Sequence, residues 1–175
     1  MPEHTALISN ADAAVPVYLF TTETWRDDAD LPDGLAALAK AQSFDGGSGQ
    51  MIIGATDAGE ISGVLFGLGK GADALAVAAL SAKLKAGDYR LSNIEDRELA
   101  VHAIAWADGA YRFDRYLKKP AEPPRLVVGS DALGDAIIRE AIAIDRLRDM
   151  VNTPAEDMGP PEIQGTISDL AERYS

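Results

Sequence analysis

Short β-rich runs alternate with longer amphipathic stretches along the whole chain, and this alternation constrains the fold more than any other feature. The runs are rich in Val, Ile, Leu and Phe and are bounded by turn residues, which is typical of buried strands. We expect strands at Val15–Phe20, Gln50–Thr56, Ile61–Leu68, Asp88–Leu91 and Leu126–Gly129. A short connector that contains glycine, Asp57–Glu60, separates the second run from the third and predicts a hairpin.

The stretches between these runs place apolar residues three and four positions apart, which is the spacing of one helix face. We expect helices at Leu35–Phe44, Ala72–Lys85, Glu95–Leu117, Ala132–Met150 and Glu162–Tyr174. Helices that alternate with strands, together with one hairpin, predict the α/β class: a mixed sheet with helices on both faces.

Charge and composition exclude several classes of function. The 175-residue chain has 28 acidic and 16 basic residues and a formal net charge of −12, so neither nucleic acid nor an anionic membrane is expected as a partner. Cysteine is absent, which excludes disulfides, thiolate metal sites and cysteine nucleophiles. No apolar stretch reaches the ~20 residues of a membrane-spanning helix. The N-terminal residues also lack the basic segment of a signal peptide, so a cytoplasmic location is expected.

A glycine-rich turn, Gly67–Gly71, lies between an expected strand and an expected helix, which is the context of a phosphate-binding loop. Val64 stands where a P-loop has its first glycine, and Gly71 stands where it has Ser or Thr. Ala72 fits the third place of the dinucleotide fingerprint, but Asp88 is too near to be its ribose-binding acid. We therefore expect these glycines to permit a tight turn and not to hold a phosphate.

Catalytic and metal-ligating patterns are sparse. The two histidines, His4 and His102, are far apart in the sequence and have no ligand-spaced neighbour, and His102 falls off the main apolar face of its helix. Gly47–Gly49 places a serine between glycines but lacks the strand-to-helix context of a nucleophile elbow. The residues alone therefore predict no catalytic, cofactor-binding or metal-binding side chain.

Two longer segments carry a distinctive pattern: Trp106–Tyr116 reads WADGAYRFDRY, and Arg148–Pro160 reads RDMVNTPAEDMGP. The first resembles the G-A-Y-x-F-x-x-Y segment in the N-terminal domain of the leucine (cytosol) aminopeptidase family. The second is similar to the R-D-L-V-N-T-P segment that joins that domain to the family's catalytic domain, although Met150 replaces Leu and Glu156 stands near a common Asn. VLFGLGK, at Val64–Lys70, supports the resemblance, and the order and spacing of all three segments match.

The resemblance implies three parts. Residues 1–129 are expected to form an N-terminal, macro-domain-like mixed sheet flanked by helices. Residues 130–152 are expected to form a connecting helix, and residues 153–175 the beginning of a truncated catalytic domain.

For the complete protein, the resemblance implies a cytoplasmic, usually hexameric enzyme that removes leucine-like N-terminal residues from peptides. Two divalent ions, Zn or Mn, are expected in its catalytic domain. The family's ligand segments, G-K-G followed by D-T/S-G-G and then N-T-D-A-E-G-R, do not occur complete here. Ala72-Asp73-Ala74 follows Gly69-Lys70-Gly71, so Lys70 is not expected to bind metal.

The chain alone is therefore expected to be inactive, to pack against its own catalytic domain, and to act in assembly and in access to the active site. Two alternatives stay open. One is a macro-type module that binds ADP-ribose or another nucleotide at Gly67–Gly71. The other is a stand-alone interaction domain that uses the apolar stripe of the last expected helix, which ends at Tyr174.

Overall fold

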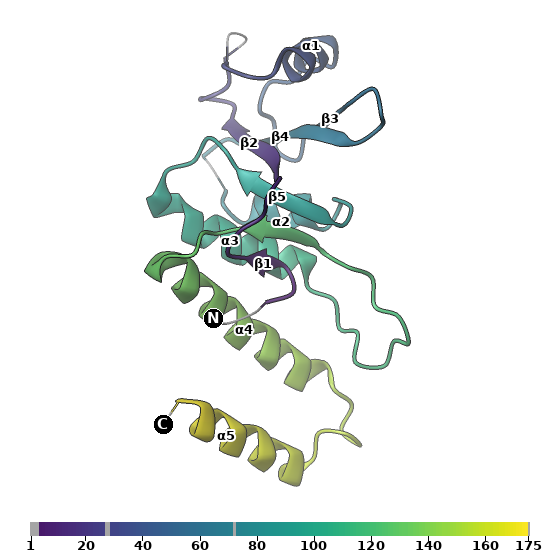
Figure 1. Cartoon of the computed structure of the whole chain (residues 1–175), viewed down its shortest axis with the longest axis vertical. Coiled ribbons are helices and arrows are strands. Elements are labelled where there is room, and N and C mark those ends of the chain that lie inside the picture. The colour runs from purple at the N-terminus through teal and green to yellow at the C-terminus, as the bar shows by residue number, and fades with distance from the viewer. Residues whose placement is uncertain (1–3, 27–28, 72, 175) are drawn as a thin grey trace.

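A computed structural model describes residues 4–26, 29–71 and 73–174. It contains a six-stranded sheet with helices packed on both faces, which confirms the predicted α/β class (Figure 1). Along the chain the elements are β1 (Leu7–Ile8), β2 (Val15–Thr21), α1 (Asp33–Ala41), β3 (Met51–Ala55), β4 (Ile61–Gly69), α2 (Ala76–Ser81), β5 (Gly87–Leu91), α3 (Asp96–Ala110), β6 (Pro124–Val127), α4 (Ala132–Asn152) and α5 (Pro160–Tyr174).

The strand order in the sheet is β1-β6-β5-β2-β4-β3. The first five strands run parallel, and β3 pairs antiparallel with β4 as the predicted hairpin. The strand β1 was not predicted, because two residues show no periodicity. Its place is set by parallel pairing with β6, where Leu7 lies opposite Leu126.

Two apolar cores lie on opposite faces of the sheet, and β4 contributes to both. Val64 and Phe66 belong to the larger core, beneath α2, α3 and α4, whereas Leu65 belongs to the smaller core beneath α1. All three side chains are fully buried. Because successive side chains of a strand point to opposite faces, the continuous apolar run of β4 serves both layers. Each such burial contributes about 1.5–3 kcal/mol to stability.

The contact between α2 and α3 depends on Gly109. A Cβ atom at this position would lie 2.0 Å from the carbonyl oxygen of Ala78, so only glycine permits the two helices to approach this closely. Beside it, the hydroxyl of Ser81 donates to the carbonyl oxygen of Trp106 at 2.8 Å. The buried indole of Trp106 donates in turn to the carbonyl oxygen of Pro124 at 3.1 Å. These contacts fix α3 against α2 and β6.

The helix α2 is shorter than predicted, since it spans Ala76–Ser81 and not Ala72–Lys85. Before it begins, the side chain of Asp73 accepts a hydrogen bond from the amide of Leu75 at 3.0 Å, which stabilises a turn. Ala72 lies outside the described residues. Ala and Leu favour a helix over the whole predicted stretch, but the turn at Asp73 and the packing against α3 limit the helix to the middle of that stretch.

The helix α3 ends at Ala110, and the prediction that it continues to Leu117 is wrong. Tyr111 adopts an extended backbone conformation, with φ −56° and ψ 135°. Arg112 then donates to the carbonyl oxygens of Gly109 and Tyr111, at 3.0 and 2.7 Å, and so satisfies exposed acceptors at the helix end. The apolar spacing that continues beyond Ala110 therefore belongs to a loop.

The two last helices extend the domain away from the sheet. The carboxylate of Asp131 caps α4 by accepting from the amide of Gly134 at 2.9 Å. Pro160 occupies the first turn of α5, where its missing N–H costs nothing. Figure 1 shows α5 at the end of the molecule farthest from α1. Among the described helices, none has both the length and the apolar character that crossing a bilayer requires.

Candidate functional site

The glycine-rich segment Gly67–Gly71 forms the end of β4 and the turn after it, and the loop that precedes β3 contacts Gly67 and Gly69. The amide of Gly69 donates to the carbonyl oxygen of Gly46 at 2.9 Å. A Cβ at Gly67 would lie 2.0 Å from the carbonyl oxygen of Gly47. Glycine is needed at Gly67 because two backbone segments touch there, and the amide of Gly69 already has a protein partner.

The geometry beside this turn also differs from a phosphate-binding loop. The helix that follows, α2, has six residues and begins only at Ala76, so no long helix N-terminus faces the turn. Lys70 is exposed at its edge. Nucleotide binding is therefore not the function that the turn favours.

The side chains of both histidines are buried against other segments of the chain. His4 is almost fully buried; its Nδ1 accepts from the amide of Ala6 at 3.1 Å, so Nε2 carries the proton and donates to Asp145 at 2.8 Å. Both ring nitrogens are thus engaged, and His4 fastens the N-terminal segment to α4.

His102 is buried on α3, and the expectation that it lies off the apolar face is wrong. Burial lowers its pKa, while the carbonyl of Ala74 and the charge of Glu98 act in the opposite direction. Its Nδ1 has no hydrogen-bond partner. A neutral imidazole that holds the turn before α2 fits these contacts.

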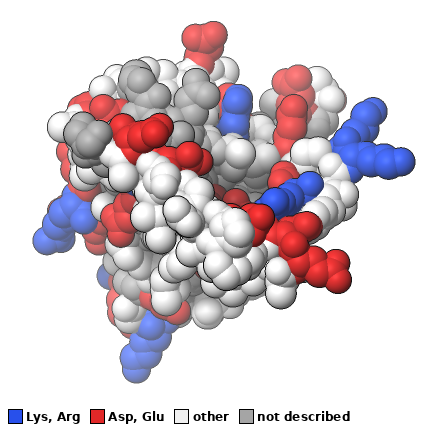
Figure 2. Space-filling model, turned by 90° about the horizontal axis from the view of Figure 1, so that it is seen from below, with Lys and Arg blue, Asp and Glu red and all other residues white. Residues whose placement is uncertain are grey.

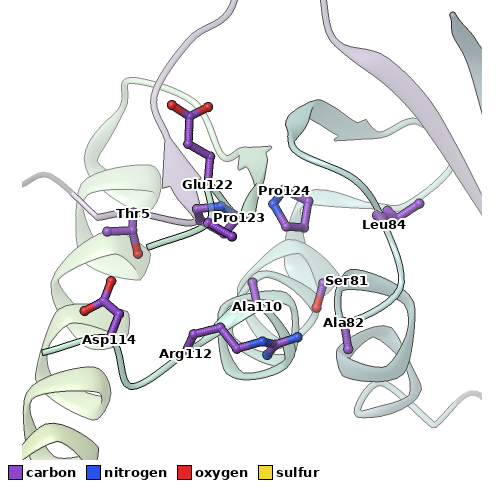
Figure 3. Close-up of a pocket in the computed structure, with 11 residues that line it drawn as sticks. Thr5, Ser81, Ala82, Leu84, Ala110, Arg112, Asp114, Glu122, Pro123 and Pro124 are labelled. Atoms are coloured by element: carbon purple, nitrogen blue, oxygen red, sulfur yellow. The ribbon is translucent and has the colours of Figure 1, made fainter. Parts of the chain in front are cut away.

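A hollow of about 210 Å³ lies at the amino ends of β5 and β6, and Figure 3 shows the side chains around it. Its lining includes Thr5, Ser81, Arg112, Glu122 and Pro124. The Arg112 guanidinium is held by the carbonyl oxygens at the end of α3, and the Ser81 hydroxyl donates to backbone carbonyls. Both side chains are thus held by backbone carbonyl groups of α2, α3 and the residue after α3.

The most concentrated set of polar contacts connects the loop after α3 with the end of α4. Tyr111 donates to the carboxylate of Asp149 at 2.7 Å and accepts from Asn152 at 3.0 Å. The guanidinium of Arg148 stacks over the Tyr111 ring, 3.9 Å from its centroid, and pairs with Asp108 on α3. The pKa of Tyr111 is raised by burial and by the Asp149 carboxylate, so the phenol stays a donor at neutral pH.

Two further contacts continue this set toward α5. Arg115 donates to the hydroxyl of Thr153 at 3.2 Å, and Tyr116 donates to Asp157 at 2.5 Å. The hydrogen bond to Asp157 raises the pKa of Tyr116. We call these contacts the strap, which consists of Tyr111, Arg115 and Tyr116 on one side and Asp149, Asn152, Thr153 and Asp157 on the other.

The strap connects the two segments that carry the family resemblance, Trp106–Tyr116 and Arg148–Pro160. Nothing in their separate patterns predicted that they touch. The structure brings them together because α3 and α4 pack side by side and α3 ends where α4 passes it.

Beyond the strap, large apolar side chains point into solvent. We call them the apolar face: Leu147 and Val151 on α4, exposed by 63% and 77%, and Ile163 and Ile167 on α5, exposed by 39% and 60%. Figure 2 views the molecule from this end, where uncharged atoms cover the middle of the surface and charged side chains stand around them. Both pairs have a spacing of four, so each forms a stripe along its helix. A helix stripe of this kind is stable when another surface covers it.

The fold and the apolar face are those of an α/β domain with a two-helix extension. Residues 15–129 match the M17 aminopeptidase, N-terminal domain family, and the chain belongs to this family. The matched residues include β2 through β6, and α4 and α5 follow them.

Solved structures share the fold. Cytosol aminopeptidase from Coxiella burnetii superposes with a TM-score of 0.81 at 23% identity, covering 96% of this chain and 38% of that chain. A mutant of tomato leucine aminopeptidase has a TM-score of 0.62 at 16% identity, covering 99% and 44%. The bottromycin maturation enzyme BotP in complex with Mn has a TM-score of 0.62 at 22% identity, covering 92% and 36%. The chain thus spans less than half the length of these relatives. A comparison with curated protein sequences gave no match.

Proposed function

We propose that this chain is the non-catalytic N-terminal domain of a metal-dependent aminopeptidase that removes leucine-like residues from peptide N-termini. The observation that carries the proposal is the family match at residues 15–129. The names of the Coxiella and tomato structures support the aminopeptidase activity of the complete protein.

The proposal divides the chain into three parts. Residues 1–129 form the N-terminal domain, 130–152 the connecting helix, and 153–175 the beginning of the catalytic domain. In support, the matched region ends at Gly129, immediately before the capped start of α4. The apolar face then lies on the connecting helix and on the first catalytic-domain helix, where a catalytic domain would cover it. Covering an exposed Leu, Val or Ile side chain contributes roughly 1.5–3 kcal/mol.

The two divalent ions of the proposed enzyme belong to its catalytic domain. Within the described residues, no three His, Asp or Glu side chains are grouped so that they could hold a metal ion. In this proposal Lys70, which is exposed at the end of β4, is not one of the ligands of that centre.

In this proposal the strap has a mechanical role. It holds the end of α4 against α3 through Tyr111 and Asp149, so it sets the direction in which the chain enters the catalytic domain. A fixed direction lets the domain stand at a defined place beside the active site, and there it would limit access for long substrates and support a hexamer in the cytoplasm.

Turnover of a leucine anilide by the purified 175-residue chain, with Mn²⁺ or Zn²⁺ added, tests the proposal. We expect none, whereas an authentic leucine aminopeptidase in the same buffer serves as the positive control. Metal-dependent turnover that copurifies with the chain would overturn the non-catalytic assignment. Calorimetric titration with ADP-ribose tests the nucleotide alternative, for which we expect no heat of binding.

A further inference from the structure

The strand β3 forms one edge of the sheet, with β4 beside it. The backbone carbonyl oxygen of Gln50 accepts from the amide of Gly67 at 2.9 Å, and the amide of Thr56 donates to the backbone carbonyl oxygen of Glu60 at 2.8 Å. Both of these even-numbered residues therefore direct their backbone groups toward β4 and the turn before it. Because the bonding direction alternates along an antiparallel strand, the odd-numbered residues direct their N–H and C=O groups away from β4. These residues are Met51, Ile53 and Ala55.

Charged side chains and proline normally prevent an edge from pairing with another strand, and this edge has neither, although the register with β4 shifts between Gly54 and Ala55. Residues 46–56 contain no charged side chain and no proline, although a quarter of the chain is charged. Ile53 is exposed by 40%. The opposite edge differs, since β1 has two residues and offers a much shorter ladder.

We propose that β3 pairs antiparallel with β3 of a second copy of this chain, around a two-fold axis at Ile53. In this register Ile53 lies opposite Ile53 of the other copy, and Met51 lies opposite Ala55. Each outward-facing donor then meets an outward-facing acceptor, and the side chains that meet on the same face are apolar.

The charge distribution limits where a second copy can approach this chain. Two chains of net charge −12 repel each other wherever their acidic surfaces meet, so they can approach most easily along an uncharged segment. The register places Asp57 opposite Gly49 of the other copy and not opposite Asp57.

This interface is independent of the proposed function. Figure 1 places β3 near α1, at the end of the molecule opposite α5. A catalytic domain bound to the apolar face and a second copy bound to β3 would therefore not compete. Association through either surface is therefore distinguishable by substitution.

Sedimentation velocity of the 175-residue chain, from micromolar to submillimolar concentration, tests the proposal. We expect a monomer–dimer equilibrium that Ile53→Pro abolishes, because proline removes the outward N–H while β4 continues to bond Ile52 and Gly54. Ile53→Lys should abolish it too, since it places like charges opposite each other at the axis. The matched control Ile53→Val keeps the N–H and the branched side chain and should still dimerise.

Hydrogen exchange gives a second measurement that does not depend on how a variant folds. The amides of Met51, Ile53 and Ala55 should gain protection as concentration rises, whereas the amide of Ile52 should be protected throughout. A chain that stays monomeric at every concentration overturns the proposal. So does a dimer that survives Ile53→Pro and Ile53→Lys but is lost in Leu147→Asp, because that dimer forms through the apolar face.

Discussion

The phenol of Tyr111 and the carboxylate of Asp149 join the end of α3 to the last turn of α4, with donor and acceptor 2.7 Å apart. One residue comes from each of the two segments that resemble the aminopeptidase family. The resemblance thus reflects a contact in the fold: the tyrosine, the arginine and the asparagine of the two patterns meet in the strap and in the stacking of Arg148.

Removing the Tyr111 hydroxyl should weaken the strap. Tyr111→Phe loses the bond to Asp149 and the bond from Asn152, and we expect it to lower the free energy of unfolding by about 0.5–1.5 kcal/mol. Urea denaturation measures this change. Tyr116→Phe, at an exposed contact with Asp157, is the control and should have a smaller effect. Equal unfolding midpoints for Tyr111→Phe and the unmodified chain would contradict a stabilising strap.

The chain should lose stability in alkali. Burial raises the pKa of Tyr89, and burial together with Asp149 raises that of Tyr111. A raised folded-state pKa gives stability that is fully present below the unfolded value of about 10 and declines as the pH rises through the folded value. Urea midpoints across this range should fall above about pH 10, and less steeply in Tyr111→Phe. Urea midpoints that stay constant above pH ~10 would contradict this prediction.

The neutral state of His102 should make the fold sensitive to acid. Its pKa is lowered by burial, so its contribution is present above the unfolded value of about 6.5 and declines as the pH falls through the folded value. His102→Leu should remove this part of the acid response, and the difference in unfolding free energy between the two proteins should change below pH ~6.5. If that difference is constant with pH, His102 does not titrate as proposed.

Two Gly→Ala substitutions should have opposite effects. Gly109→Ala places a methyl group 2.0 Å from the Ala78 carbonyl oxygen, so α2 and α3 must separate, and we expect a loss of about 1–3 kcal/mol. Gly165→Ala has no atom within 4 Å and lies on α5, where the higher helix propensity of Ala is worth up to about 1 kcal/mol. Circular dichroism melting of both variants provides the comparison. An unchanged melting temperature for Gly109→Ala would contradict the close contact between α2 and α3 at this position.

Leu147 should matter for docking and little for folding of the chain alone. Because its side chain is 63% exposed, Leu147→Asp should change the unfolding free energy by no more than about 0.5 kcal/mol. The same change should reduce binding of a fluorescent apolar dye, since it introduces a charge into the apolar face. Leu99→Asp, at a side chain packed against the core, is the contrasting variant and should unfold the protein. Unchanged dye binding by Leu147→Asp would indicate that the dye binds elsewhere.

Much of the fold could be predicted from local pattern. The hairpin β3–β4 was correct because two β-rich runs flank a glycine-containing turn, and α4 was correct because Asp131 caps a long apolar stripe. The end of α3 was not predictable in this way. No glycine or proline follows Ala110 before Pro120, and the extended conformation of Tyr111 accompanies a contact with a residue 38 positions further along the chain.

By itself the sequence determined the α/β class, most of the element positions and the family, because periodicity, turns and short motifs depend on neighbours a few residues apart. Only the tertiary structure decided that β2 lies between β4 and β5, that the Gly69 amide bonds to Gly46, and that Leu147 and Val151 stay exposed. These outcomes depend on which distant segments pack together, and such packing is a property of the whole chain that no local pattern contains.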